Sequence, residues 1–279
     1  MNLLCEMEGK NILLAQQESP SRGFSDRECD WIRALTGDLP AIRGLDFIHD
    51  DYAGVVERAR RFDSLGGIVT ICWHTGLREN HYPASKEENP DWERIFREGT
   101  EEHRLLLDRW DRAAEALGQL QSDGIPVLWR PFHEFDGQWF WWGKEGPEAF
   151  RQLWAMMHEY FEDRCGLHNL IWVLGYSGEI KEGWEVDPAL FDAVGSDTYS
   201  GETTHAEAYR RLREMYPGKL LCFHECGLIP PVDAFFDEGS PWSWIMPWHS
   251  GYLLNNHPSR ILEAYRDARM VTLKRLPRF

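Results

Sequence analysis

Eight short apolar runs, separated by longer amphipathic stretches, are the feature of this 279-residue sequence that most limits its fold. The runs are 12–16, 41–46, 67–74, 126–130, 169–174, 193–197, 219–224 and 242–248. Helical patterns occupy 51–65, 91–122, 147–165, 205–216 and 258–269. Strands that alternate with helices form parallel sheets, because each return to the same end of the sheet needs a long crossover. The sequence therefore predicts an α/β fold built from βα units.

Cap residues and chain length favour a closed barrel. Pro147 stands at an expected helix start, and Gly66, Gly124 and Gly166 follow expected helix ends. Eight βα units in about 250 residues match a (β/α)8 barrel. An open doubly wound sheet would normally carry a glycine-rich phosphate loop after its first strand, but the first run leads into Gln-Gln-Glu. We expect one domain, a (β/α)8 TIM barrel spanning 1–279.

Charge and composition narrow the range of partners. The chain has 30 Lys and Arg against 46 Asp and Glu, which gives a formal net charge of −16. Such a surface repels phosphate backbones and anionic lipid heads, so we expect neither nucleic acid nor membrane as the partner. No apolar run approaches the roughly 20 residues that cross a bilayer. The six cysteines include no CxxC pair and are interpreted as small buried side chains.

Two glutamates follow apolar runs where a barrel would place its active site. Glu134 comes just after the fourth run, and Glu225 comes just after the seventh. In (β/α)8 barrels the active site lies at the C-terminal ends of the strands. If side chains alternate along each strand, Glu134 shares a face with Arg130, and Glu225 shares a face with Leu221 and Phe223. Both carboxylates then point into the mouth of the barrel.

Two opposed carboxylates are what hydrolysis of a glycosidic bond requires. One protonates the leaving oxygen while the other attacks or stabilises the anomeric carbon. An eight-stranded barrel is narrow enough for the two to approach to about 5–5.5 Å, the spacing of a retaining mechanism. Glu134 would then hold a proton while Glu225 is ionised. For either glutamate alone, a structural role as a helix cap or ion-pair partner is the alternative.

Other catalytic centres find less support in the sequence. After His133 and Glu134 the chain continues Phe-Asp-Gly, so the second histidine of H-E-x-x-H is missing. No H-x-H follows the first run, and the segment GYSGE lacks the final glycine of a serine nucleophile elbow. Neither G-x-G-x-x-G nor a Walker sequence occurs. We expect no metal and no cofactor.

Four consecutive aromatic residues follow Glu134, at 139–142 within the sequence GQWFWWG. Neighbouring side chains point in different directions, so no single helix or strand face buries all four. Some of them, Trp139 and Trp142 among the candidates, are expected to face solvent or a ligand. Aromatic faces offer stacking area to the apolar side of a pyranose ring. A hydrophobic plug over the barrel rim is the alternative for part of the group.

Residues 130–143, RPFHEFDGQWFWWG, resemble the acid/base signature of glycoside hydrolase family 26, which is best known for endo-β-1,4-mannanases. Segments 9–17, 67–74 and 195–199 resemble the family's first, third and sixth strands, and 223–227 resembles its nucleophile strand. The similarity covers nearly the whole chain and implies a retaining hydrolase on a (β/α)8 barrel. The chain is short for the family, which implies trimmed loops and fewer subsites.

The resemblance also implies roles for single residues, with Glu134 as the acid/base and Glu225 as the nucleophile. The residues expected to bind substrate are His74, Arg130, His133, Trp139, Trp142, Asp197, Tyr199 and Trp244. Tyr199 is expected to donate a hydrogen bond to Glu225, and Arg130 to favour its charged form. Beside Glu225 the chain departs from the family, which more often has a small or apolar residue before the glutamate and an aromatic after it. Here His224 and Cys226 hold these positions.

The two glutamates do not identify the sugar, because mixed-linkage β-glucanases and β-1,3-xylanases of the family use the same pair. We favour cleavage of internal β-1,4 linkages in mannan, with a β-1,3-1,4-glucanase or β-1,3-xylanase as alternatives. A barrel that binds oligosaccharide without cleaving it is the alternative of another class. The expected partner is a β-mannan or related β-glycan, bound by a monomer. The first residues, MNLLCE, predict no signal peptide, so the protein is secreted if such a segment was removed and cytoplasmic otherwise.

Overall fold

The computed structural model describes residues 1–20 and 26–277, and its centre is a closed ring of parallel strands. The strands are β1 (Ile12–Gln17), β2 (Ile42–Asp46), β3 (Ile68–Cys72), β4 (Val127–Arg130), β5 (Leu170–Gly175), β6 (Ala193–Thr198), β7 (Leu220–Cys226) and β8 (Trp244–Pro247). Each pairs with the next, and β1 pairs with both β8 and β2, which closes the ring. All eight predicted strands are present, and the (β/α)8 barrel is confirmed. A short β9 (Met270–Val271) adds to β1.

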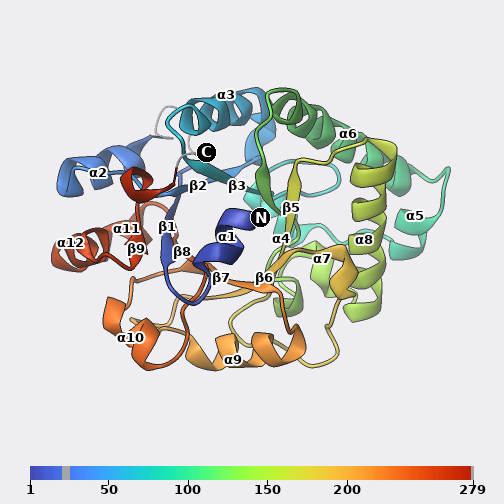
Figure 1. Ribbon diagram of the computed structural model, residues 1–279. Coiled ribbons are helices and arrows are strands. Elements are labelled where there is room, and N and C mark those ends of the chain that lie inside the picture. The colour runs from blue at the N-terminus through green and yellow to red at the C-terminus, as the bar shows by residue number, and fades with distance from the viewer. Residues whose placement is uncertain (21–25, 278–279) are drawn as a thin grey trace.

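Helices surround the ring, as Figure 1 shows. The longer ones are α2 (Arg27–Thr36), α3 (Tyr52–Asp63), α6 (Glu101–Ser122), α8 (Pro147–Glu159), α9 (Ala206–Met215) and α12 (Pro258–Arg266). The shorter ones are α1 (Asn2–Met7), α4 (Tyr82–Glu87), α5 (Trp92–Phe96), α7 (Trp141–Lys144), α10 (Val232–Asp237) and α11 (Gly251–Leu254). None of the helices in the described part of the chain has the length and apolar character to cross a membrane.

The predicted helix 91–122 is in fact two helices, α5 and α6. The break contains Gly99, whose φ of 80° lies in the left-handed region that favours glycine. Thr100 then caps α6, because its hydroxyl accepts a hydrogen bond from the His103 N–H. The helix-end glycines Gly66 and Gly124 also have positive φ, as their positions after helices predicted. The sequence pattern did not predict α2 or the short helices.

The core has two parts, one inside the barrel and one between the strands and the helices. Alternate strand residues fill the interior, among them Leu13, Leu128, Leu220 and Trp244. Their neighbours, such as Trp129, face outward and pack with helix residues. Burial on both sides explains why the strands read as continuous apolar runs.

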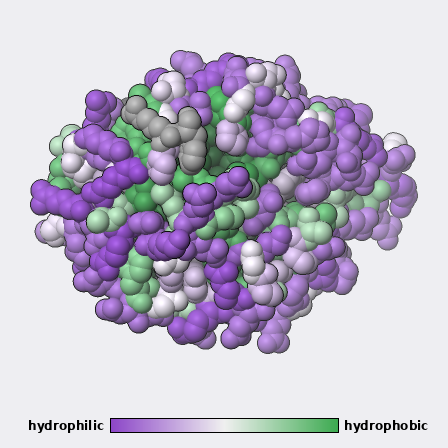
Figure 2. All heavy atoms as spheres, in the orientation of Figure 1, coloured by the Kyte–Doolittle hydropathy of each residue, from purple (hydrophilic) through white to green (hydrophobic). Residues whose placement is uncertain are grey.

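Helix α1 covers the N-terminal end of the barrel, where it lies across the centre of the ring in Figure 1. Leu4 of this helix packs against the interior cluster. A hollow of about 800 Å³ beside it is lined mainly by apolar residues, including Leu3, Ile68 and Leu128. Figure 2 shows this face as mostly hydrophilic, with hydrophobic residues gathered near its centre. The carboxylates that the sequence singled out do not line this hollow, because they lie at the opposite ends of the strands.

Candidate active site

Three carboxylates meet at the C-terminal ends of β4, β6 and β7. Glu134 follows β4, Asp197 lies near the end of β6, and Glu225 is the penultimate residue of β7. One oxygen from each carboxylate lies within 4.8 Å of the others. Glu134 and Glu225, which are 91 positions apart in sequence, therefore face a common pocket.

Glu225 reaches the pocket through a β-bulge and not through simple alternation. The pairing of β6 with β7 shifts by one residue, because Ser196 pairs with Phe223 but the next residue, Asp197, pairs with Glu225. His224 is the extra residue, so both His224 and Glu225 point inward. Phe223 packs outward against the helix layer. The prediction that Leu221 and Phe223 share the face of Glu225 was wrong for this reason.

The Glu225 carboxylate is held by two donors. Arg130 Nη1 donates to its Oε1 at 2.6 Å, and the Tyr199 hydroxyl donates to its Oε2 at 2.7 Å. The pKa of Glu225 is raised overall, chiefly by burial and also by the charge of Glu134, whereas Arg130 and the Tyr199 hydrogen bond lower it and limit the rise. The two donors therefore stabilise the ionised form in a site that burial would otherwise make unfavourable for charge.

Glu134 lies in a tight turn beyond the end of β4. Its φ of 53° is in the left-handed region, as is that of Phe132 at 49°. The Glu134 N–H donates to the carbonyl of Gly175 at 2.7 Å, which ties the turn to β5. Trp139 Nε1 donates to Glu134 Oε2 at 2.9 Å. The turn, and not an extension of the strand, therefore aims this half-buried carboxylate at the pocket.

Asp197 is the third carboxylate and has a different protonation preference. Burial raises its pKa well above the usual range, and its hydrogen bond with Glu134 and the nearby negative charges add to the rise. A neutral carboxyl group at this position shares its proton in the hydrogen bond with Glu134. The close approach of three acids is thus tolerated without three negative charges.

Two histidines connect Glu225 to β2. Asp46 Oδ2 lies 2.6 Å from His74 Nδ1, and His74 Nε2 lies 3.1 Å from His133 Nε2, which is itself 3.6 Å from Glu225 Oε1. Burial lowers the pKa of His74, but the Asp46 carboxylate outweighs burial and the pKa rises overall. Burial and Arg130 lower the pKa of His133 well below its usual value. His133 is therefore neutral beside the carboxylate.

A cavity of about 410 Å³ opens above these groups. It is lined by Pro20, Asp46, Ile48, His49, His74, Tyr82, Glu134, Phe140, Tyr199, Glu225, Trp248, His249 and Tyr252. Its volume lies in the range of small-ligand sites. The exposed aromatic residues in the described part of the chain are Tyr82, Trp139, Tyr199 and Tyr252. Three of them line the cavity, and the fourth, Trp139, contacts Glu134.

The predicted substrate-binding residues divide into three groups: residues at the cavity or beside it, buried residues next to the two glutamates, and two tryptophans that lie deeper. His74 and Tyr199 line the cavity, and Trp139 stands half-exposed beside Glu134. Arg130, His133 and Asp197 are almost fully buried next to Glu134 and Glu225. Each contacts one of these two glutamates, so a role in holding the glutamates fits the three residues better than direct contact with a ligand.

Trp142 and Trp244 are corrections, because neither has surface to offer a sugar. Trp142 is fully buried, stacks on Phe140 with ring centroids 4.5 Å apart, and donates from Nε1 to the His133 carbonyl. Trp244 lies in the barrel interior, where it pairs with Leu13 of β1. Both side chains lie beneath the residues that line the cavity. Trp142 supports the turn that carries Glu134, and Trp244 fills the barrel.

Sequence reasoning missed Tyr82, His49, Trp248 and Tyr252. Trp248 directly follows β8, so the rule that sites lie at strand ends could have selected it in place of Trp244. The other three lie in the segments 48–50, 82–87 and 251–254, which carry no periodic signal long enough to place a side chain. They reach the cavity only through tertiary structure.

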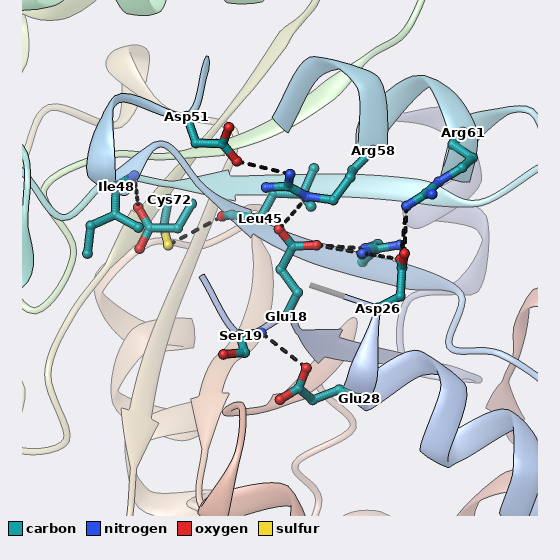
Figure 3. A network of polar contacts seen from close by, with 12 residues as sticks. Glu18, Ser19, Asp26, Glu28, Leu45, Ile48, Asp51, Arg58, Arg61 and Cys72 are labelled. Atoms are coloured by element: carbon teal, nitrogen blue, oxygen red, sulfur yellow. Dashed lines mark hydrogen bonds and ion pairs between the residues drawn. The ribbon is translucent and has the colours of Figure 1, made fainter. Parts of the chain in front are cut away.

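Ion pairs fix the side of the barrel next to the cavity, as Figure 3 shows. Glu18, just beyond β1, accepts from Arg43 of β2 at 2.6 Å and from Arg58 of α3 at 2.9 Å. Arg58 also bonds Asp51 at 3.0 Å. These ion pairs join the end of β1 to β2 and α3. Glu18 lies two residues before Pro20, which lines the cavity. None of the four ion-paired residues lines the cavity, which gives these ion pairs a supporting role.

Two groups of described residues bring three potential metal ligands within 4.8 Å, and neither suits a cation well. The carboxylate group already receives hydrogen bonds from Arg130, Tyr199 and Trp139. In the second group, Asp46 and His74 bond each other, and burial raises the pKa of the Cys72 thiol well above its usual value. A neutral thiol is a poor ligand.

Comparison with known proteins agrees with this geometry. The family model described as "Glycosyl hydrolase family 26" matches residues 1–272. A mannan endo-1,4-β-mannosidase of Thermothelomyces thermophilus is 28% identical over 95% of this chain and 58% of its own length. One from Bacillus subtilis is 30% identical over 73% of this chain and 62% of its length. The chain spans about half the length of the first curated relatives it matches.

Solved structures extend the comparison. A β-mannanase from a symbiotic protist of the termite Reticulitermes speratus, crystallised with a gluco-manno-oligosaccharide, is 27% identical, with a TM-score of 0.88. The match covers 98% of this chain and 92% of that one. The Podospora anserina GH26-CBM35 β-(1,4)-mannanase gives a TM-score of 0.87 at 28% identity, over 98% of this chain and 65% of that one. The match of the family model to nearly the whole chain shows that the chain belongs to glycosyl hydrolase family 26.

Proposed function

We propose that the protein is a retaining glycoside hydrolase that cleaves internal β-1,4 linkages of mannan-type polysaccharides. The observation that carries the proposal is the close approach of Glu134 and Glu225, whose nearest oxygens lie within 4.8 Å. This separation leaves no room for a water between sugar and carboxylate, which an inverting enzyme needs with its carboxyl groups about 6.5–9.5 Å apart. The names of the mannan-cleaving relatives support mannan as the substrate.

The surroundings of the two carboxylates support different roles. Arg130 and Tyr199 hold Glu225 ionised and oriented, so it acts as the nucleophile at the anomeric carbon. Glu134 is half-buried, and Trp139 donates to one of its oxygens. The proton that Glu134 shares with Asp197 in their hydrogen bond is the one that goes to the leaving oxygen. The product of this first step is a glycosyl-enzyme ester on Glu225.

Water completes the reaction. Glu134, now deprotonated, removes a proton from an incoming water, and the resulting attack on the anomeric carbon breaks the bond to Glu225. Two inversions give net retention, and both side chains return to their starting states. The aromatic residues around the cavity would bind sugar rings on either side of the cleaved bond.

Digestion of four polysaccharides tests the proposal: mannan, glucomannan, mixed-linkage β-glucan and β-1,3-xylan. We expect manno-oligosaccharides of several lengths from the first two, and NMR of the first product should show the β-anomer. Cleavage confined to β-glucan or xylan would replace mannan by that polymer. An α-anomer as first product would refute the retaining mechanism, and binding without new reducing ends would refute catalysis.

A further inference from the structure

His224 is the bulge residue of β7, and it bridges two other strands. Its side chain is fully buried. Its Nδ1 lies 3.1 Å from Arg130 Nη1 of β4, and its Nε2 lies 2.9 Å from the carbonyl oxygen of Tyr176, just beyond β5. Both ring nitrogens are thus engaged, one on each side.

The partners of His224 fix where its proton lies. A guanidinium only donates hydrogen bonds, so Nδ1 must offer Arg130 a lone pair. A carbonyl oxygen only accepts, so Nε2 must carry the hydrogen. The neutral Nε2–H tautomer satisfies both contacts, and the imidazolium does not. Burial and the charge of Arg130 lower the pKa of His224 well below its usual value, in agreement with a neutral ring.

Arg130 depends on this contact for its position. Its Nη1 donates to both Glu225 Oε1, at 2.6 Å, and His224 Nδ1, at 3.1 Å. Its buried Nε and Nη2 atoms find no hydrogen-bond partner within residues 1–20 and 26–277. The Trp248 ring, 5.9 Å from Cζ, adds a diffuse contact. His224 is therefore the directional neutral contact that holds the guanidinium beside Glu225.

The end of β5 leaves space for the imidazole. A Cβ at Gly175 would lie 3.0 Å from His224 Nε2 and 3.1 Å from its Cε1. It would also lie 3.2 Å from Cβ of His133. All three distances are shorter than most contacts of this kind. An alanine at position 175 would push the ring off the Tyr176 carbonyl or off Arg130.

We propose that His224 is a positioning residue for the nucleophile, with its Nδ1 lone pair holding Arg130 against Glu225. This inference rests on the proposed function, because it assigns the role of Arg130 in orienting the attacking carboxylate. It assigns a role to His224, which stands where the family more often has a small or apolar residue. The role is directional: it needs an acceptor at the place of Nδ1, not merely a side chain of the right volume.

Two amide variants separate acceptor from volume. Asparagine can place its Oδ1 near the position of Nδ1, whereas the longer glutamine carries its whole amide group to the position of Nε2, away from Arg130. We expect His224→Asn to lower kcat by no more than about threefold and His224→Gln to lower it about 10- to 100-fold with KM nearly constant. Equal losses in the two variants, or no loss in either, would overturn the proposal.

A second measurement does not depend on activity. In protein labelled with ¹⁵N-histidine, the His224 ring should show an unprotonated Nδ1 and a protonated Nε2 at neutral pH, with the signal assigned by its loss in His224→Asn. An Nδ1–H tautomer or an imidazolium would refute the positioning role. If the wild type shows the expected tautomer but cleaves none of the four polysaccharides, the proposed function fails while the contact to Arg130 stands.

Discussion

The floor of the cleft and its rim are built by opposite rules. The floor residues Arg130, Asp197, His224 and Glu225 are all at most 3% exposed and come from the strands β4, β6 and β7. The rim residues Tyr82, Trp139 and Tyr252 are 39–46% exposed and come from the short helices α4 and α11 and the loop before α7. A charged side chain that is buried away from water needs fixed hydrogen-bond partners, whereas a sugar ring needs an exposed flat surface to bind to. Changes in the floor should therefore affect the rate of the reaction, and changes in the rim should affect binding.

The largest effect is expected for Glu225→Gln, which removes the proposed nucleophile but keeps the shape of the side chain. We expect kcat on mannan to fall on the order of 10⁴-fold or more. Initial rates of reducing-end release measure this. The exposed Glu145→Gln is the matched control and should retain full activity. A loss of less than tenfold in Glu225→Gln would show that another group attacks.

Glu134→Ala should separate substrates by their leaving groups. Without an acid, mannan should suffer a loss of about 10²- to 10⁴-fold, whereas an activated aryl mannoside needs little protonation and should form the glycosyl-enzyme at nearly normal rate. Steady-state and burst kinetics on the two substrates give the comparison. Equal losses in the first step on both would contradict the role of Glu134 as the acid.

Tyr199 belongs to both regions, because it is 38% exposed and also donates to Glu225. We expect Tyr199→Phe to lower kcat about 10- to 100-fold with a smaller change in KM. The lost hydrogen bond had lowered the pKa of Glu225, so this pKa should rise. Since the nucleophile must be ionised, the acid limb of the kcat/KM profile should move to higher pH.

Other groups around Glu225 also titrate or carry charge. They are Arg130, Glu134, His74, His133 and Asp197. The shift of the acid limb is therefore measured as the difference between the Tyr199→Phe variant and the wild type, because both proteins contain these groups. A KM change alone, with an unmoved acid limb, would place Tyr199 in the rim only.

The smallest effect is expected for Tyr252→Ala. Its ring packs against Tyr199 with centroids 4.7 Å apart and has no contact with either glutamate among the described interactions. Loss of one stacking surface should raise KM for the polymer about three- to tenfold and leave kcat nearly unchanged. Tyr82→Ala in α4, which also lines the cavity, provides a parallel measurement. A drop in kcat larger than the rise in KM would break the division between floor and rim.

The same division explains what the sequence could predict. The eight strands were predicted correctly because residues such as Leu13 and Trp129 are buried on the two sides of the sheet and produce apolar runs. The paired glutamates followed from their places at strand ends. The prediction that Leu221 shares a face with Glu225 was wrong, because a bulge adds one residue to β7 and shifts the alternation of its side chains. Tyr82 and Tyr252 were missed because no periodicity links short connecting segments to a cavity.

The bulge in β7 has a consequence for how this strand can vary. Leu220 and Cys222 face the barrel interior, and the extra residue lets Glu225 face the same way. Loss of the bulge at unchanged strand length would turn the Glu225 carboxylate toward the helices, because simple alternation places residue 225 on the face of Phe223. Substitutions that keep the bulge change local contacts, but the bulge itself sets the direction of the Glu225 side chain. In this strand, the bulge should therefore be under tighter constraint than the identity of the residues around it.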